Sequence, residues 1–438
     1  MLKKIIFFIV FFSLKSFATD NLHHFKLKNG MEVLLIPDNK TELVMHSVFY
    51  KVGGLQDFYG KAGLAHFLEH LMFRATKNYK SGELINFFDN NGLFYNAATG
   101  HELTFYYELG RKELLEDLMK FESDRMKNLI LKDDEINKER EIVKEERRMR
   151  VDNVPEEQFL EKLSSIYYNN GYYGQSLIGS MNDLNAISNQ DFRNFYYKYY
   201  NPNNAILVIN GNFEIQKTKK LIEKYYGRLQ NNKDNKLSGY YRNDKPDLSK
   251  ENLRFEQQNK NLSQSSYFYM TNGGTFRSKK NNNGFVNEFL AYIIQNGDKM
   301  LTKKLVEEKK IASQISLQYD PYGYDRSPFL IKITPTDDSK IKEIDEFMKN
   351  FFQSNKNIID KKELQRLKNL YIGQNIYAMD NLQSKNLIYG QALLAGLKPD
   401  IINNMDKHIK KITVKDVNNA YKEFFIKNNH IVGILSRG

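Results

Sequence analysis

Residues 63–73 read GLAHFLEHLMF and place two imidazoles and a carboxylate within an otherwise apolar stretch. His66 and His70 are four residues apart, so on a helix their side chains lie on one face. Two imidazoles in that position can bind one Zn²⁺. Glu69 borders the same face and can reach a water molecule at the metal. The alternative interpretation is two ordinary histidines beside a glutamate that favours a helix, because so short a motif also arises by chance.

A catalytic zinc needs a third protein ligand, and the charged segment DDEINKEREIVKEERRMR is the best source of one. Its Glu139 and Glu146 are seven residues apart, so they lie about 20° from each other around a helix. The apolar residues between them, Ile142 and Val143, indicate a face that points inward. Glu145 is the rival ligand, but its side chain points about 100° away from that of Glu146.

The composition is that of a folded protein, with 41% hydrophobic, 13% aromatic and 27% charged residues among 438. A chain of this length predicts two or three domains. The formal net charge is +12, but lysines and arginines alternate with acidic residues and form no basic stripe. We therefore expect no nucleic-acid binding. The chain has no cysteine, so it can form no disulfide.

The N-terminus has the pattern of a secretory signal peptide, residues 1–18. Lys3 and Lys4 precede an apolar run over 5–14, and Ser16-Phe17-Ala18 is a cleavage site of the small-x-small type. The apolar run is too short for a transmembrane helix, which needs about 20 residues. We therefore expect secretion across the inner membrane into the periplasm, with no membrane span after cleavage.

The chain contains an internal repeat. Residues 187–209 and 412–434 align without a gap, and eight of their positions are identical. Each copy predicts an amphipathic helix, a turn with asparagine and a strand. We predict a zinc-binding domain over 19–230, a linker over 231–250 and a homologous domain without metal over 251–438.

The expected fold class is α+β: two homologous domains, each a mostly antiparallel sheet packed with helices, facing each other across a chamber. In the first domain the pattern predicts strands at 32–36, 43–52, 93–96 and 103–109, and helices at 62–74, 81–91, 111–126, 133–151 and 156–168.

The motif H-x-x-E-H with a glutamate on a later helix resembles the insulinase/pitrilysin-type zinc peptidases, or inverzincins. The segments KLKNGMEVLLIPD, NAATGHELTFYYEL, FESDRM and EREIVKEERR are similar to that family as well. The resemblance runs from about residue 24 to the C-terminus and is most specific in the first half. It is strongest to the small bacterial, processing-peptidase-like branch.

The resemblance implies an exported zinc metalloendopeptidase with one Zn²⁺ per chain. His66, His70 and Glu146 would be the metal ligands, and Glu69 the general base acting on a zinc-activated water. Glu139 would orient a ligand imidazole from behind.

The resemblance also implies how peptide substrates bind. Asn96 and Ala97 match the segment whose strand edge pairs with the peptide; the alternative for Asn96 is a plain turn residue. Active single-chain relatives carry an arginine and a tyrosine in the second half, where this chain has LVEEKKIAS, 305–313. Val306 stands at the arginine position and Ser313 at the tyrosine position.

This departure predicts a heterodimer with a same-fold subunit that carries the Arg/Tyr pair. The competing interpretation is that Tyr319, Tyr322 or Tyr324 substitutes and the chain acts alone or as a homodimer. A second hypothesis on function is a non-catalytic peptide-binding subunit with a residual metal site.

Overall fold

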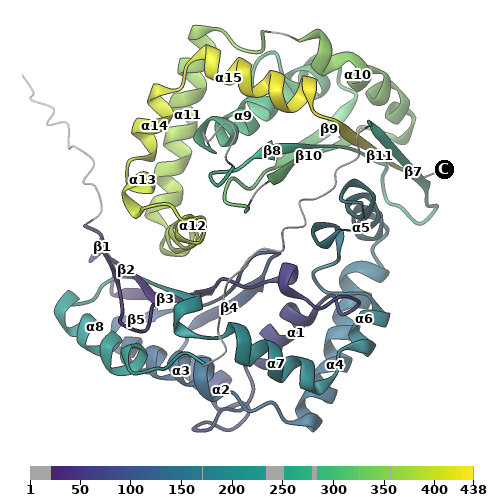
Figure 1. Ribbon diagram of the computed structural model, residues 1–438. Coiled ribbons are helices and arrows are strands. Elements are labelled where there is room, and N and C mark those ends of the chain that lie inside the picture. Colours follow the sequence, from purple (N-terminus) through teal and green to yellow (C-terminus); the bar gives the residue numbers. More distant parts are fainter. Residues whose placement is uncertain are drawn as a thin grey trace, which may run out of the picture.

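The computed structural model describes residues 21–169, 171–232, 251–278, 284–324, 326–355 and 357–437. The predicted signal peptide and most of the predicted linker lie outside these ranges. Two units follow each other along the chain, each a sheet with helices packed against it (Figure 1). The predicted α+β class with two homologous domains is confirmed. No helix in the described ranges is long and apolar enough to cross a membrane.

The first sheet has six described strands in the order β1-β2-β6-β3-β5-β4. Only β2 and β6 are parallel neighbours. The outer strand β4 is one of the two edges of this sheet. The bounds are β1 His23–Lys26, β2 Glu32–Pro37, β3 Leu43–Tyr50, β4 Phe94–Thr99, β5 Thr104–Arg111 and β6 Ala205–Gly211.

The second sheet repeats this arrangement with five described strands in the order β7-β11-β8-β10-β9, in which β7 and β11 are parallel. This explains the repeat in the sequence. Strands β6 and β11 occupy equivalent places in the two sheets and are 225 positions apart, the same offset that separates residues 187–209 from 412–434. The bounds are β7 Leu253–Gln258, β8 Ser266–Gly274, β9 Ala312–Gln318, β10 Arg326–Pro335 and β11 His430–Ser436.

The helices follow the same order in both halves. Those of the first are α1 Leu64–Leu71, α2 Glu83–Asn90, α3 Leu115–Asn128, α4 Asp133–Arg147, α5 Pro155–Tyr167, α6 Met181–Ala186, α7 Asn189–Tyr199 and α8 Ile215–Ile222. Those of the second are α9 Gly284–Asn296, α10 Ile341–Ser354, α11 Lys361–Asp380, α12 Leu382–Leu394, α13 Pro399–Asn403, α14 Met405–Lys411 and α15 Val414–Tyr421. All strands and helices predicted for the first half exist, with ends shifted by a few residues. After α4, a π-helical turn covers Arg148–Asp152.

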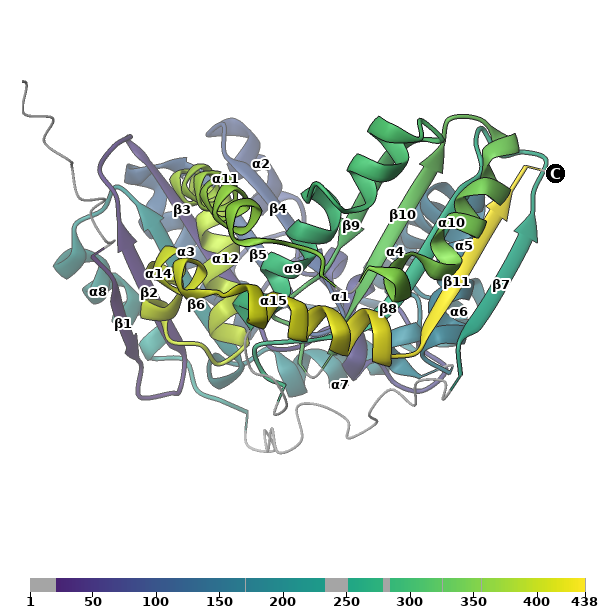
Figure 2. The ribbon, with the colours of Figure 1, turned by 90° about the horizontal axis from the view of Figure 1, so that it is seen from above.

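Each half gives one helix to the sheet of the other half. Helix α12 packs on β6 and β3 of the first sheet, and α5 packs on β11 and β7 of the second (Figure 2). Gly390 of α12 lets the helix approach Phe49 so closely that a Cβ there would lie 2.2 Å from the ring. On the other side, Gly433 of β11 makes room for Phe159 of α5 in the same way. This exchange was not predicted from the sequence.

Polar contacts fix the register of the exchanged helices. The Asn386 amide of α12 donates to Ser47 Oγ at 3.0 Å, and Glu156 of α5 forms an ion pair with Lys332. Because both faces of each sheet are covered, all seven residues of β6 and all nine of β8 are buried. Buried central strands of this kind read as continuous apolar runs in the sequence.

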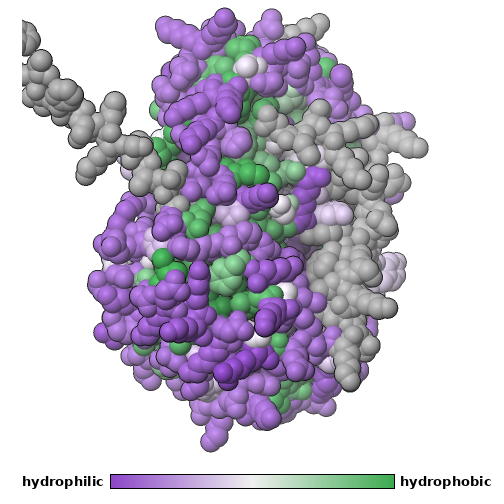
Figure 3. All heavy atoms as spheres, turned by 60° about the vertical axis from the view of Figure 1, so that its left-hand side comes forward, coloured by the Kyte–Doolittle hydropathy of each residue, from purple (hydrophilic) through white to green (hydrophobic). Residues whose placement is uncertain are grey.

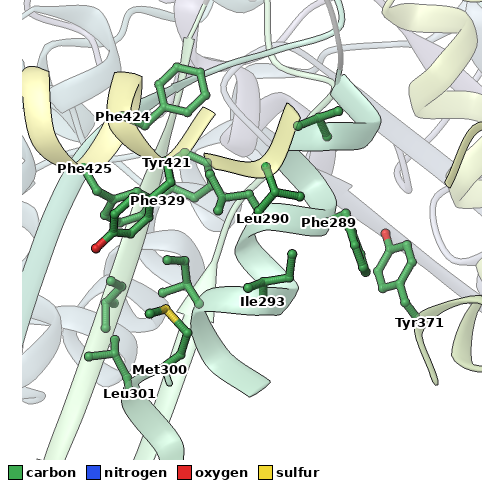
Figure 4. Close-up of a cluster of buried hydrophobic side chains, with 14 of the residues drawn as sticks. Phe289, Leu290, Ile293, Met300, Leu301, Phe329, Tyr371, Tyr421, Phe424 and Phe425 are labelled. Atoms are coloured by element: carbon green, nitrogen blue, oxygen red, sulfur yellow. The ribbon is translucent and has the colours of Figure 1, made fainter. Parts of the chain in front are cut away.

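The larger apolar core lies in the second half (Figure 4), where Phe289 of α9, Phe329 of β10 and Phe425 near the C-terminus belong to one cluster. The outer surface is mostly hydrophilic on the face shown in Figure 3, with only small apolar patches. Most of the apolar burial that stabilises the fold is therefore in the layers of sheet and helix, including the two exchanged helices.

Gly390→Ala is expected to destabilise the protein, because the added methyl group collides with the fully buried ring of Phe49. Overpacking of this kind costs about 1–3 kcal/mol, which a lower midpoint of thermal unfolding would report. Gly373→Ala is the matched control: this glycine also lies within a helix, α11, but a Cβ there meets nothing within 4 Å. That substitution should leave the midpoint unchanged or raise it, since alanine favours a helix by about 1 kcal/mol. Equal midpoints for the two variants would contradict the close approach at Gly390.

Candidate metal centre

Helix α1 begins at a fixed point because of its N-terminal contacts. Both carboxylate oxygens of Asp57 accept from its first turn, one from the N–H of Gly63 at 2.7 Å and one from Ala65 at 2.8 Å. Gly63 has φ +89°, and a Cβ there would lie 2.4 Å from the carbonyl oxygen of Ile178. Burial raises the pKa of Asp57 to about 8, although the backbone N–H groups work against the shift. Asp57 and Gly63 therefore set where the histidines of α1 point.

The structure brings His66 and His70 of α1 together with Glu146 of α4. The Oε2 atom of Glu146 lies 3.7 Å from His66 Nε2 and 3.2 Å from His70 Nε2. All three donor atoms lie within 4.8 Å of one another, and this is the one such cluster among the residues that the structure describes. Tetrahedral zinc with bonds of about 2.0–2.2 Å separates its ligand atoms by about 3.3–3.6 Å. The two distances from Glu146 are close to those separations.

The chemistry of the donors fits zinc as well. Two imidazoles and one carboxylate form a known catalytic ligand set. The Oε2 atom of Glu146 is buried and makes no hydrogen bond of acceptable geometry with the described residues. A buried carboxylate oxygen in that state is costly, and a cation would compensate it.

Glu139 supports the cluster from behind. Its Oε1 lies 3.0 Å from Nδ1 of His70, and its other oxygen forms an ion pair with Arg74. With Nδ1 bound to Glu139, Nε2 is the atom directed at the cluster, and it can bind a metal once its own proton has left. Burial acts against protonation of His70, but the carboxylates of Glu139 and Glu146 outweigh it and raise the pKa of His70 to about 9. His66 has no such partner, and burial, aided by His70, lowers its pKa to about 4.

Glu69 lies beside the cluster and not in it. Its carboxylate is largely buried, and its Oε2 accepts a hydrogen bond from the hydroxyl of Thr99. Burial raises the pKa of Glu69, although the Thr99 hydroxyl opposes the shift. Sequence reasoning missed Thr99, because a threonine at a strand end is too common to stand out. It also missed Asp57, whose role depends on the backbone of residues six and eight positions later.

Asn96 and Ala97 lie inside the edge strand β4, so the alternative of a plain turn residue does not hold. Asn96 borders a cavity of about 310 Å³ together with Glu69, His70 and Arg74. The free edge of β4 thus runs past the cluster. Peptide binding by Asn96 and Ala97 stays a prediction.

The predicted inward face of α4 is only partly right. Val143 and Glu139 are buried, but Ile142 is 50% exposed. The face turned toward α1 is therefore narrower than the apolar pair suggested. Glu145 is exposed and forms an ion pair with Arg148 at 2.7 Å. It does not belong to the cluster of possible metal ligands.

Neither residue at the positions of the Arg/Tyr pair supplies polar groups to the cluster. Val306 packs against the core of the second half. The hydroxyl of Ser313 lies 3.3 Å from the carbonyl oxygens of Thr334 and Pro335, at the far edge of the second sheet. Val306 and Ser313 therefore do not substitute for the arginine and the tyrosine that relatives carry at these positions.

Comparisons with known proteins place the chain in one family. Residues 32–181 match the family "Insulinase (Peptidase family M16)", and residues 186–371 match "Peptidase M16 inactive domain". The chain is 28% identical to the zinc protease PqqE of Helicobacter pylori, over 91% of this chain and 89% of that protein. It is 27% identical to the mitochondrial-processing peptidase subunit beta of Saccharomyces cerevisiae, over 47% of this chain and 44% of that one.

Solved structures show the same fold. A protease from Helicobacter pylori superimposes with a TM-score of 0.85 at 24% identity, covering 96% of this chain and all of that one. The first half of the periplasmic protease PqqL from Escherichia coli gives 0.80 at 18% identity, covering 96% and 93%. The chain therefore has the two-domain fold of these proteases. The chain belongs to the insulinase family, peptidase family M16.

Glu146→Gln is expected to lower the affinity for zinc far more than Glu145→Gln, because only Glu146 lies within reach of both imidazoles. The loss should exceed the roughly 10–100-fold effect typical of residues that merely support a ligand, and Glu139→Gln should fall in that range. Zinc content per chain after dialysis against graded chelator measures all three variants. Equal losses for Glu145→Gln and Glu146→Gln would remove Glu146 from the ligand set.

Proposed function

We propose that this protein is a zinc metalloendopeptidase that hydrolyses peptides, with Glu69 as general base. The observation that carries the proposal is the convergence of His66, His70 and Glu146 beside a buried glutamate and next to the free edge of β4. The relatives named zinc proteases support it.

A peptide that adds to β4 as a further strand would be held by main-chain hydrogen bonds, which fix its backbone without regard to sequence. Zinc held by His66, His70 and Glu146 would supply Lewis-acid polarisation of the scissile carbonyl and lower the pKa of the attacking water. Glu69 accepts the proton that this water loses as its oxygen bonds to the carbonyl carbon. The same carboxyl group then donates the proton to the departing nitrogen as the C–N bond breaks.

Thr99 prepares Glu69 for this role. Its hydroxyl binds Oε2 of the carboxylate, so Oε1 remains as the oxygen that can face the attacking water. A base with a fixed orientation needs no reorganisation at the moment of proton transfer.

The second candidate function is a non-catalytic subunit that binds peptides. The match of residues 186–371 to a domain named inactive favours it, as do Val306 and Ser313. The metal cluster, however, belongs to the first half, where all three proposed ligands are present and two of them, His70 and Glu146, have a charged neighbour that holds them. This observation favours the enzyme.

Glu69→Gln should keep its zinc and lose peptide cleavage, since the amide cannot accept the proton and the residue is not a ligand. A loss of about 10²–10⁴-fold is the usual contribution of a general base. Metal content and turnover of a fluorogenic peptide library, compared between wild type and variant, measure the two effects separately. Wild-type activity that survives a chelator, or full activity of Glu69→Gln, would rule out this mechanism.

We further propose that the protein is exported, on the pattern of residues 1–18, and works with a second exported subunit of the same fold. That subunit would lack H-x-x-E-H and carry the Arg/Tyr pair that Val306 and Ser313 replace. The processing-peptidase relative, named as a subunit, is a precedent within the family.

Adding the partner subunit should raise the cleavage rate by about 10²–10³, the value of one charged contact to the transition state. Co-purification from the native source, followed by assays with and without the partner, tests this. An isolated chain as active as the complex would support the competing interpretation, in which a tyrosine of this chain substitutes.

A further inference from the structure

Two cavities border β4, and the smaller one is also lined by Glu69. The smaller one contains Asn96. The larger one, of about 620 Å³, lies between the two halves and contains Ala98 and Thr99, at the end of the same strand. Because Thr99 also binds Glu69, the larger cavity begins at the proposed catalytic centre. Successive residues of a bound strand are about 3.3 Å apart and point to alternate sides, so a peptide along β4 has a side chain that can enter it.

The walls of the larger cavity are mostly apolar and come from both halves. Phe105 and Leu103 contribute from the first half, Met270 and Leu330 from the second sheet, and Leu387 from the exchanged helix α12. Such walls suit the stem of a long side chain.

Three charged side chains line the cavity, those of Glu102, Arg277 and Asp320. The first two are paired with each other. Glu102 accepts from the hydroxyl of Tyr173 at 2.7 Å and from the backbone N–H of Tyr324 at 2.6 Å. The guanidinium of Arg277 lies 4.0 Å from the same carboxylate. The charges of Glu102 and Arg277 therefore largely cancel. His101 is neutral at pH 7, because burial lowers its pKa to about 4.

Asp320 leaves the cavity with an excess negative charge. It lines the cavity, and its Oδ1 accepts from the N–H of Tyr322 at 2.8 Å. Burial raises the pKa of this carboxyl group, although the N–H of Tyr322 opposes the shift. It forms no ion pair with any residue that the structure describes, and Glu102 is close enough for the two carboxylates to repel each other. An incoming cation would relieve this repulsion, whereas an anion would increase it.

We propose that this cavity binds one side chain of the substrate, a lysine or an arginine at a single position beside the cleaved bond, and that Asp320 determines the preference. The apolar walls hold the methylene stem, and the carboxylate of Asp320 meets the cationic end. This inference rests on the proposed peptidase function, since it places the peptide along β4 next to Glu69.

The test is positional-scanning cleavage by the zinc-loaded protein, with lysine, its uncharged isostere norleucine and glutamate at each position around the cleaved bond. Wild type should favour lysine over norleucine by about three- to fivefold at one position, the worth of one partly exposed ion pair. Asp320→Asn should remove this preference, and Asp320→Lys should turn it toward glutamate. Glu346→Lys is the matched control, because Glu346 is exposed on α10 and lines neither cavity.

Binding of the same peptides to the zinc-loaded Glu69→Gln variant, followed by fluorescence anisotropy, separates this inference from the proposed reaction. The same order of affinities there, lost on adding Asp320→Lys, supports the cavity assignment even if wild type cleaves nothing. An unchanged order of peptides in Asp320→Lys overturns it. So does a preference for aromatic residues that no Asp320 variant alters.

Discussion

The fold depends on one constraint: neither sheet can cover both of its faces with helices of its own half. The missing cover for the first sheet is α12, and that for the second is α5. Gly390 and Gly433 allow the exchanged helices to approach closely enough to exclude water. Burying both faces of β6 and β8 contributes apolar area that a single half could not bury alone. The exchanged helices therefore join the two halves, and the cavity between them is lined from both.

The candidate metal centre depends on contacts within the first half. The proposed ligands come from two helices far apart in the sequence, α1 and α4, and two of them are held by neighbours, His70 by Glu139 and Glu146 by Arg150. Asp57 fixes the start of α1, and Arg74 holds Glu139, which in turn holds His70. A site whose donor atoms are positioned before the metal arrives binds it without paying for reorganisation. This also explains why so many charged groups can lie in a half-buried place: each of them has a partner of opposite charge or a hydrogen-bond donor.

Sequence patterns predicted much of this organisation, and the misses have physical reasons. That Glu146 lies close to the histidines of α1 could be predicted, because helical spacing is local and the chemistry of zinc restricts its ligands; their binding of a metal stays a prediction. Ile142 was placed wrongly, because two adjacent apolar residues on a helix cannot both face the same neighbour. The roles of Asp57 and Thr99 depend on backbone and side-chain contacts that leave no periodic signal. The helix exchange could not be predicted either, since α5 has the same amphipathic pattern whichever sheet it covers.

The two homologous halves differ in the side chains that join their equivalent helices. The topological counterparts of α1 and α4 in the second half are α9 and α11. There, Tyr371 of α11 packs on Phe289 and Tyr292 of α9, with ring centroids 5.4 and 5.1 Å apart; Phe289 and Tyr371 face each other in Figure 4. Aromatic contacts thus join the two helices where, in the first half, carboxylates meet imidazoles. Aromatic packing contributes stability without the cost of buried charge. The second half supplies α12 as cover for the first sheet and part of the wall of the cavity.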